Sequence, residues 1–92
     1  MRAEHTAVTV LRVAAGGRIG RHPATGDQLL LVVEGRGRVR SGDGDWQPVA
    51  AGDVVRWRDG EDHTTEADEA LVAYVVEYED QVCCPGRLLE VV

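Results

Sequence analysis

Short apolar runs, each ended within a few residues by Gly, Asp or Pro, place the strongest limit on what this chain can fold into. Examples are LLLVV, DVVRW and LVAYVVEY, whose β-branched residues suit strands. No segment shows helical periodicity, and closely spaced turn residues between β-rich runs are typical of antiparallel sheets. The sequence therefore predicts an all-β protein, a small antiparallel barrel of about eight or nine short strands.

Two of the expected strands carry a signal about their place in a sheet. Residues 28–34 hold the strongest apolar run and fit a strand buried on both faces. Pro48 marks its strand as an edge strand or a strand end, because proline cannot donate a hydrogen bond to a neighbouring strand. Residues 18–22 form a short polar segment. The expected strands cover residues 5–14, 28–34, 38–40, 46–49, 54–57, 64–66, 71–78 and 88–92.

The length of 92 residues predicts a single domain over residues 1–92, with a barrel core at roughly 8–78 and a C-terminal segment at 79–92. Hydrophobic residues make up 43% of the chain, but Phe is absent, so Val, Leu and Ile must fill most of the core. A small core of this kind gains stability by association, and a barrel offers flat strand surfaces to a second copy. We therefore expect a homodimer.

The charge balance limits the possible partners. A net charge of −6 and a pI of about 4.9 argue against nucleic acid and against an anionic membrane surface. No apolar run approaches the roughly 20 residues of a membrane span, and no charged leader precedes an apolar segment. We therefore expect a soluble cytoplasmic protein. Its adjacent Cys83 and Cys84 fit free thiols, because a disulfide ring between neighbouring cysteines is strained.

A histidine stands in each of two segments of similar construction, one in each half of the chain. The matching residues are Gly16, His22, Gln28 and Gly35 in the first segment and Gly52, Gly60 and His63 in the second. Their order and spacing resemble the two motifs of the cupin superfamily, a group of small jelly-roll β-barrels. The resemblance covers roughly residues 8–78 and implies that His22 and His63 point into the barrel mouth and face one another across the barrel.

The resemblance also implies a metal site, which in cupins is built from three histidines and one carboxylate. His22 and His63 keep two of these positions, whereas Ala24 and Gln28 stand where a histidine and a glutamate are usual. The second motif departs from the family pattern at Arg58, in place of proline, and Ala67, in place of asparagine. Gln28 still offers a neutral carbonyl oxygen. The implied site is thus a weakened one for a divalent ion (Zn, Fe, Mn or Ni), with His22, Gln28 and His63 as ligands.

Each of these residues also has a structural interpretation. His22 precedes Pro23 and fits a solvated loop, while Gln28 fits a buried hydrogen-bonding residue of its strand. His5 lies outside both motifs and fits the surface. The acidic residues beside His63 fit a solvated loop, although one carboxylate could orient the ring or raise its pKa. Core, dimer-contact or barrel-end positions suit three aromatic residues, Trp57, Tyr74 and Trp46.

Three functions remain open at this point. The sequence favours a protein that binds a small-molecule ligand in the barrel mouth. One alternative is a metal-dependent enzyme, of dioxygenase or isomerase type, acting on a small oxygenated or acidic substrate. Another is a metal-free dimeric structural module. No Ser-His-Asp or Cys-His arrangement is evident, so the sequence leaves open whether the protein is an enzyme.

Overall fold

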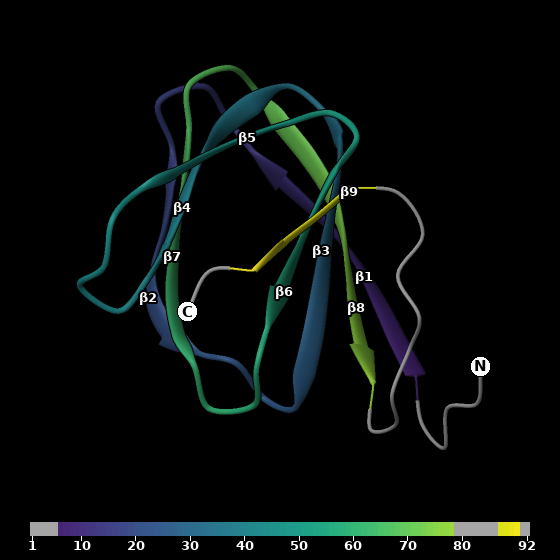
Figure 1. Ribbon diagram of the computed structural model, residues 1–92. Coiled ribbons are helices and arrows are strands. Elements are labelled where there is room, and N and C mark those ends of the chain that lie inside the picture. The colour runs from purple at the N-terminus through teal and green to yellow at the C-terminus, as the bar shows by residue number, and fades with distance from the viewer. Residues whose placement is uncertain (1–5, 79–86, 91–92) are drawn as a thin grey trace.

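The computed structural model describes residues 6–78 and 87–90, and within these ranges the chain forms nine β-strands and no helix (Figure 1). The strands are β1 (Thr6–Val13), β2 (Arg18–Pro23), β3 (Asp27–Glu34), β4 (Arg36–Ser41), β5 (Gln47–Ala50), β6 (Asp53–Trp57), β7 (Asp62–Ala67), β8 (Leu71–Tyr78) and β9 (Arg87–Glu90). The prediction of an all-β barrel is confirmed. His5, Cys83 and Cys84 lie outside the described residues, so the expectations for them stay predictions.

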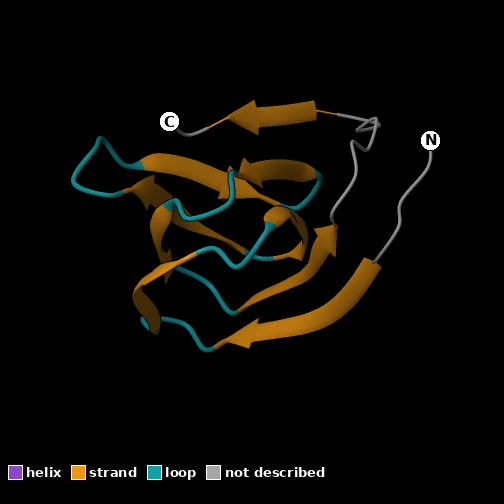
Figure 2. Ribbon diagram, turned by 90° about the horizontal axis from the view of Figure 1, so that it is seen from below, coloured by secondary structure: helices purple, strands orange, loops and turns teal. Residues whose placement is uncertain are grey.

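The strands form two sheets that face each other across the interior (Figure 2). One sheet has five strands in the order β1-β8-β3-β6-β9, and the other has four in the order β2-β7-β4-β5. Neighbouring strands are antiparallel, except that β9 runs parallel to β6 at the edge of the larger sheet. Strands from opposite ends of the sequence pair side by side, as β1 does with β8, which is the topology of a jelly roll.

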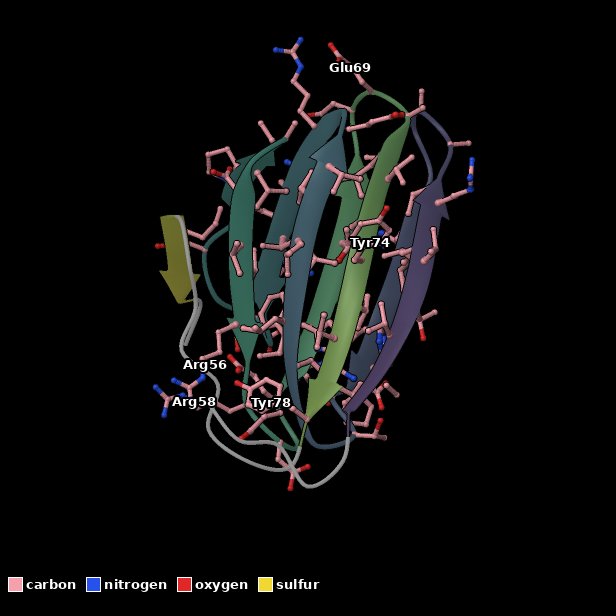
Figure 3. All side chains as sticks on the ribbon, turned by 90° about the vertical axis from the view of Figure 1, so that its right-hand side faces the viewer. Arg56, Arg58, Glu69, Tyr74 and Tyr78 are labelled. Carbon is pink, nitrogen blue, oxygen red and sulfur yellow. The ribbon has the colours of Figure 1, made fainter. Side chains whose placement is uncertain are left out.

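Alternation along each strand directs one set of side chains into the barrel. In β8, Leu71 and Ala73 are buried in the core, whereas Tyr74 is exposed on the outer surface of the sheet (Figure 3). The core includes Val39 from one sheet and Val55 from the other, both 0% exposed. Small aliphatic side chains from both sheets therefore fill most of the interior, as expected for a chain without Phe.

The two ends of the barrel differ in composition. At one end, here called the closed end, β1, β3, β7 and β8 contribute buried apolar residues, which are Val13, Val32, Ala67 and Leu71. At the other end, here called the mouth, β2 and β6 finish and β3 and β7 begin, at the bottom of Figure 1. The strands thus run between a packed apolar end and a polar one.

Two glycines let strands approach closely at the closed end. Gly35 has φ of 77°, a left-handed conformation, and a Cβ atom there would overlap the backbone of Ala70. A Cβ atom on Gly37 would overlap the carbonyl group of Glu66 in the paired strand β7. Glycine is therefore required at both positions by the packing of the backbone.

Several details of the predicted strands can now be compared with the structure. Pro48 lies on β5, an edge strand, which confirms its interpretation. The polar residues 18–23 form strand β2, which the apolar pattern missed because nearly all of its side chains are exposed. Trp46 does not cover a barrel end. Its ring instead lies 4.4 Å and 4.6 Å from the guanidinium carbons of Arg38 and Arg40 of β4.

Two further predictions, the absence of a membrane partner and the homodimer, concern different features of the structure. Among the described residues there is no helix long and apolar enough to cross a membrane. The outer surface of the five-stranded sheet carries exposed apolar residues, which are Val8, Val10, Val33 and Tyr74. The homodimer and the cytoplasmic location stay predictions.

Candidate functional site

The mouth brings together side chains from both sheets. In the four-stranded sheet, His22 of β2 lies opposite His63 of β7. In the five-stranded sheet, Gln28 of β3 lies between Trp57 of β6 and Glu77 of β8 in the strand register. All five side chains line one cavity. The residues predicted for the site, His22, Gln28 and His63, are therefore brought together.

The aromatic rings at the mouth form a short stack. The rings of His22 and His63 meet edge to face, with their centroids 4.3 Å apart. On its other side, His63 stacks on Trp57 with a centroid distance of 4.5 Å and an interplanar angle of 12°. His63 and Trp57 are buried and His22 is exposed. The prediction that the two histidines meet is confirmed, but they are neighbours on paired strands of one sheet and do not face one another across the barrel. The stack connects the two sheets through Trp57.

Both histidines are oriented by backbone carbonyl groups. Nδ1 of His22 lies 2.9 Å from the carbonyl oxygen of Gly20, and Nδ1 of His63 lies 3.1 Å from that of Glu61. In each case the partner is two residues earlier in the chain, so the local backbone fixes the ring. A carbonyl oxygen accepts only, so these contacts place the ring hydrogen on Nδ1 and leave Nε2 as the free nitrogen.

Burial lowers the pKa of His63 below its ordinary value of 6.5. The hydrogen bond to the Glu61 carbonyl opposes this shift, the neighbouring His22 adds to it, and the charges of Glu61 and Asp62 oppose it. The net direction is downward because desolvation of the charged ring is the largest of these causes. The neighbouring carboxylates therefore act on this pKa in the predicted upward direction, but burial outweighs them.

The acidic segment before His63 is fixed in place by hydrogen bonds. The Glu61 carboxylate accepts hydrogen bonds from the backbone N–H of Arg58 at 2.8 Å and from the Ser41 hydroxyl at 2.6 Å. The Asp59 carboxylate accepts one from the backbone N–H of Gly26 at 3.0 Å. These carboxylates join the β2–β3 loop, the β6–β7 loop and the end of β4, and they hold the segment that positions His63. The expectation of a merely solvated loop missed this role.

Glu77 is a residue of the site that the sequence analysis missed. Gln28, 7% exposed, donates a hydrogen bond from Nε2 to Oε1 of Glu77 at 3.3 Å. Glu77 shares its face of β8 with Leu71, Ala73 and Val75, all of which point into the barrel. This alternation was the available signal, because it places a carboxylate on the apolar face of its strand.

The cavity at the mouth has a volume of about 200 Å³. Aliphatic side chains form much of its wall, and two threonine hydroxyls lie among them. These residues are Leu11, Ile19, Leu30, Val75, Thr9 and Thr65. With the histidines, Gln28 and Glu77, the cavity combines an apolar wall with a small number of convergent polar groups.

Comparison with known proteins identifies the family. Residues 9–77 match the family model described as the cupin domain. The chain belongs to the cupin family. The resemblance seen in the sequence is confirmed, and the matched segment contains every residue of the site described above. A comparison with curated proteins finds no match.

Solved cupin structures share the fold of this chain. A conserved protein of unknown function from Streptococcus pyogenes is 25% identical, with a TM-score of 0.74 over 88% of this chain and 70% of that one. A Cupin 2 conserved barrel domain protein from Salinispora arenicola is 30% identical, with a TM-score of 0.71 over 82% of this chain and 63% of that one. An RmlC-like cupin with a double-stranded β-helix fold from Methanocaldococcus jannaschii is 15% identical, with a TM-score of 0.76 over 86% and 74%.

The donor set of this cupin does not fit a resident metal ion. Protein metal sites of Zn or Fe usually hold three strong ligands. The mouth offers two imidazoles, the neutral amide of Gln28 and the carboxylate of Glu77, which lies on the other sheet and accepts a hydrogen bond from Gln28. Ala24, at the position of a usual histidine, has no donor side chain and is buried. Among residues 6–78 and 87–90 there is no group of three or more His, Cys, Asp or Glu side chains placed to hold a metal.

Proposed function

We propose that this cupin binds a small organic molecule in the cavity at the barrel mouth. The observation that carries the proposal is the meeting of an apolar cavity wall with His22, His63, Gln28 and Glu77. Ligand sites in proteins have this character, with a mostly apolar lining and a few polar groups that fix orientation. The closed end, in contrast, is filled by apolar side chains.

The size of the cavity limits the occupant. A volume of about 200 Å³ lies below the range typical of sites for drug-sized ligands. The occupant is therefore a small molecule. The buried stack of Trp57 and His63 provides a rigid wall for it, since both rings are buried and a hydrogen bond to the Glu61 carbonyl orients His63.

The two tryptophans of the chain provide an internal control for a binding experiment. The indole of Trp57 lines the cavity, whereas that of Trp46 lies outside the barrel between Arg38 and Arg40. A fragment library screened by NMR should yield binders that shift the indole N–H resonance of Trp57 and leave that of Trp46 in place. A screen without binders, or binders that move only Trp46, would exclude the proposed site.

Elemental analysis of untagged protein separates ligand binding from the metal-dependent enzyme. We expect no stoichiometric Zn, Fe, Mn or Ni, because among the described residues no three strong ligands are placed together to hold a metal. Stoichiometric metal that disappears in His63→Ala would favour the metal site at His22, Gln28 and His63 instead. If the protein bound neither a ligand nor a metal, the metal-free dimeric structural module would be the remaining function of the three.

A further inference from the structure

The polar groups around the cavity are mostly hydrogen-bond acceptors. The Nδ1 atoms of His22 and His63 donate to backbone carbonyls, so each neutral ring has its acceptor lone pair on Nε2. Both rings line the cavity. The histidines therefore offer the cavity two acceptor nitrogens whose orientation is fixed by the backbone.

The other sheet adds further acceptors. Gln28 donates a hydrogen bond from its NH₂ group to Glu77, which occupies one of the two N–H donors of the amide within the wall. The carbonyl oxygen of Gln28 and the carboxylate of Glu77 can only accept hydrogen bonds. The hydroxyls of Thr9 and Thr65 can either donate or accept. The cavity wall therefore complements a ligand rich in hydrogen-bond donors, and it does not complement a ligand rich in hydrogen-bond acceptors.

The charge of the cavity wall also disfavours a ligand rich in acceptors, because such ligands are often anionic. Among the described residues that line the cavity, Glu77 carries a carboxylate and none is an arginine. The arginines of β2 and β4 on the outside of the smaller sheet are instead committed elsewhere, as Arg18 and Arg38 are to Glu66. An anionic ligand would therefore meet a carboxylate without a compensating cation, which is unfavourable in a partly desolvated site.

We infer that the occupant is a small organic amine in its protonated form. Its N–H donors face the acceptors of His22, His63 and Glu77, and its apolar part lies against the aliphatic wall. The inference rests on the proposed function and narrows it to one ligand class. It replaces the acidic substrate considered for the enzyme with a cationic ligand.

Three probes with one ring and different polar groups test the ligand class. Benzylamine is a cation with N–H donors, benzyl alcohol is a neutral donor, and benzoate is an anionic acceptor. Titrations at neutral pH, followed by the indole resonance of Trp57, should give an affinity for benzylamine about tenfold above that for benzoate, with benzyl alcohol between them.

A charge-neutral variant locates the source of this preference. In Glu77→Gln the affinity for benzylamine should fall about threefold, to about that of benzyl alcohol, while the affinity for the alcohol itself is affected little. Glu69→Gln is the matched control, because Glu69 is an exposed carboxylate at the closed end, paired with Arg36 (Figure 3). It should leave the ratio of the two affinities unchanged. The ratio also corrects for any loss of folded protein.

The outcomes separate the inference from the proposed function. Benzoate binding as tightly as benzylamine, or an unchanged affinity ratio in Glu77→Gln, would overturn the amine and leave the ligand site standing. If none of the three probes binds while neutral or anionic fragments still shift the Trp57 resonance, the amine would also be overturned and the ligand site would stand. Failure of every fragment would overturn both.

Discussion

The closed end and the mouth of this barrel are built by the same strands and have opposite compositions. Strand β8 contributes Leu71, 1% exposed, to the closed end and Glu77 to the mouth, and β7 contributes Ala67 and His63 in the same way. A strand that is apolar at one end and polar at the other cannot bury its whole length favourably. The difference indicates that the closed end stabilises the barrel, and it supports the proposal that the polar mouth binds a ligand.

The largest effect that tests this comparison is expected at the closed end. Leu71→Ala should lower the free energy of unfolding by about 2–5 kcal/mol, because it leaves a cavity where both sheets meet. Urea denaturation measures the loss. Val33→Ala is the matched control on the outer surface, where the side chain is 39% exposed, and should change stability by less than about 0.5 kcal/mol.

A small loss in Leu71→Ala would contradict the comparison, because it would show that the closed end does not dominate stability. The variant also separates the two ends functionally. At temperatures where it is folded, Leu71→Ala should keep the wild-type response of Trp57 to ligand, since Leu71 does not line the cavity. A weakened response in fully folded protein would show that the two ends are coupled.

The outer surface of the five-stranded sheet, between the two ends of the barrel, gives the next test, which concerns self-association. Val8 and Val10 of β1 are 63% and 53% exposed beside the exposed ring of Tyr74. Exposed apolar patches of this kind commonly mark interfaces, and a second copy offers a self-complementary one. Val10→Arg should weaken self-association about tenfold or more, measured by sedimentation velocity over a range of protein concentrations.

The matched control for association adds the same charge to the other sheet. Gln47→Arg lies on the exposed edge strand β5 and should leave self-association unchanged. Equal behaviour of the two variants would exclude the five-stranded sheet as the interface. A wild-type protein that sediments as a monomer at every concentration would exclude the homodimer itself.

Much of the fold was predictable because it depends on local alternation and on turn residues. The run at residues 71–78 alternates clearly, and β8 occupies the predicted residues. The histidine pair was predictable from the spacing of two motifs, since His22 and His63 fall at the matching ends of β2 and β7. In both cases a short segment of sequence contains the information that the structure uses.

The remainder depends on contacts between segments that are distant in the sequence. Strand β2 has nearly no buried side chains, so its existence follows from pairing with β7 and not from its own pattern. The role of Glu77 follows from its register with Gln28 across two strands. The downward shift of the His63 pKa follows from burial against Trp57, which outweighs the acidic neighbours visible in the sequence.

A smaller effect is expected from protonation at the mouth. Burial lowers the pKa of His63 in the folded chain below the ordinary 6.5, so the unfolded chain takes up the proton at higher pH. Stability from this group is complete above about pH 6.5 and is lost as the pH falls through the folded pKa. Urea denaturation at decreasing pH should show this decline in the wild type and a weaker one in His63→Gln. Parallel declines would contradict the assignment to His63.

The smallest effect is expected on the outer face of the same strand. The hydrogen bonds from Arg38 and Arg18 lower the pKa of Glu66 below its ordinary 4.5. Stability from this group is therefore present above that pH and is lost as the pH falls through the folded pKa. Both arginines are about half exposed, so salt screens the interaction.

Glu66→Gln should accordingly lower stability slightly at neutral pH, with the difference from the wild type disappearing in about 1 M salt and in acid. Measuring it together with His63→Gln separates the two faces of β7, because the two groups lose their contributions in different pH ranges. A Glu66→Gln loss larger than that of Leu71→Ala would reverse the comparison, since surface ion pairs would then outweigh the packed closed end.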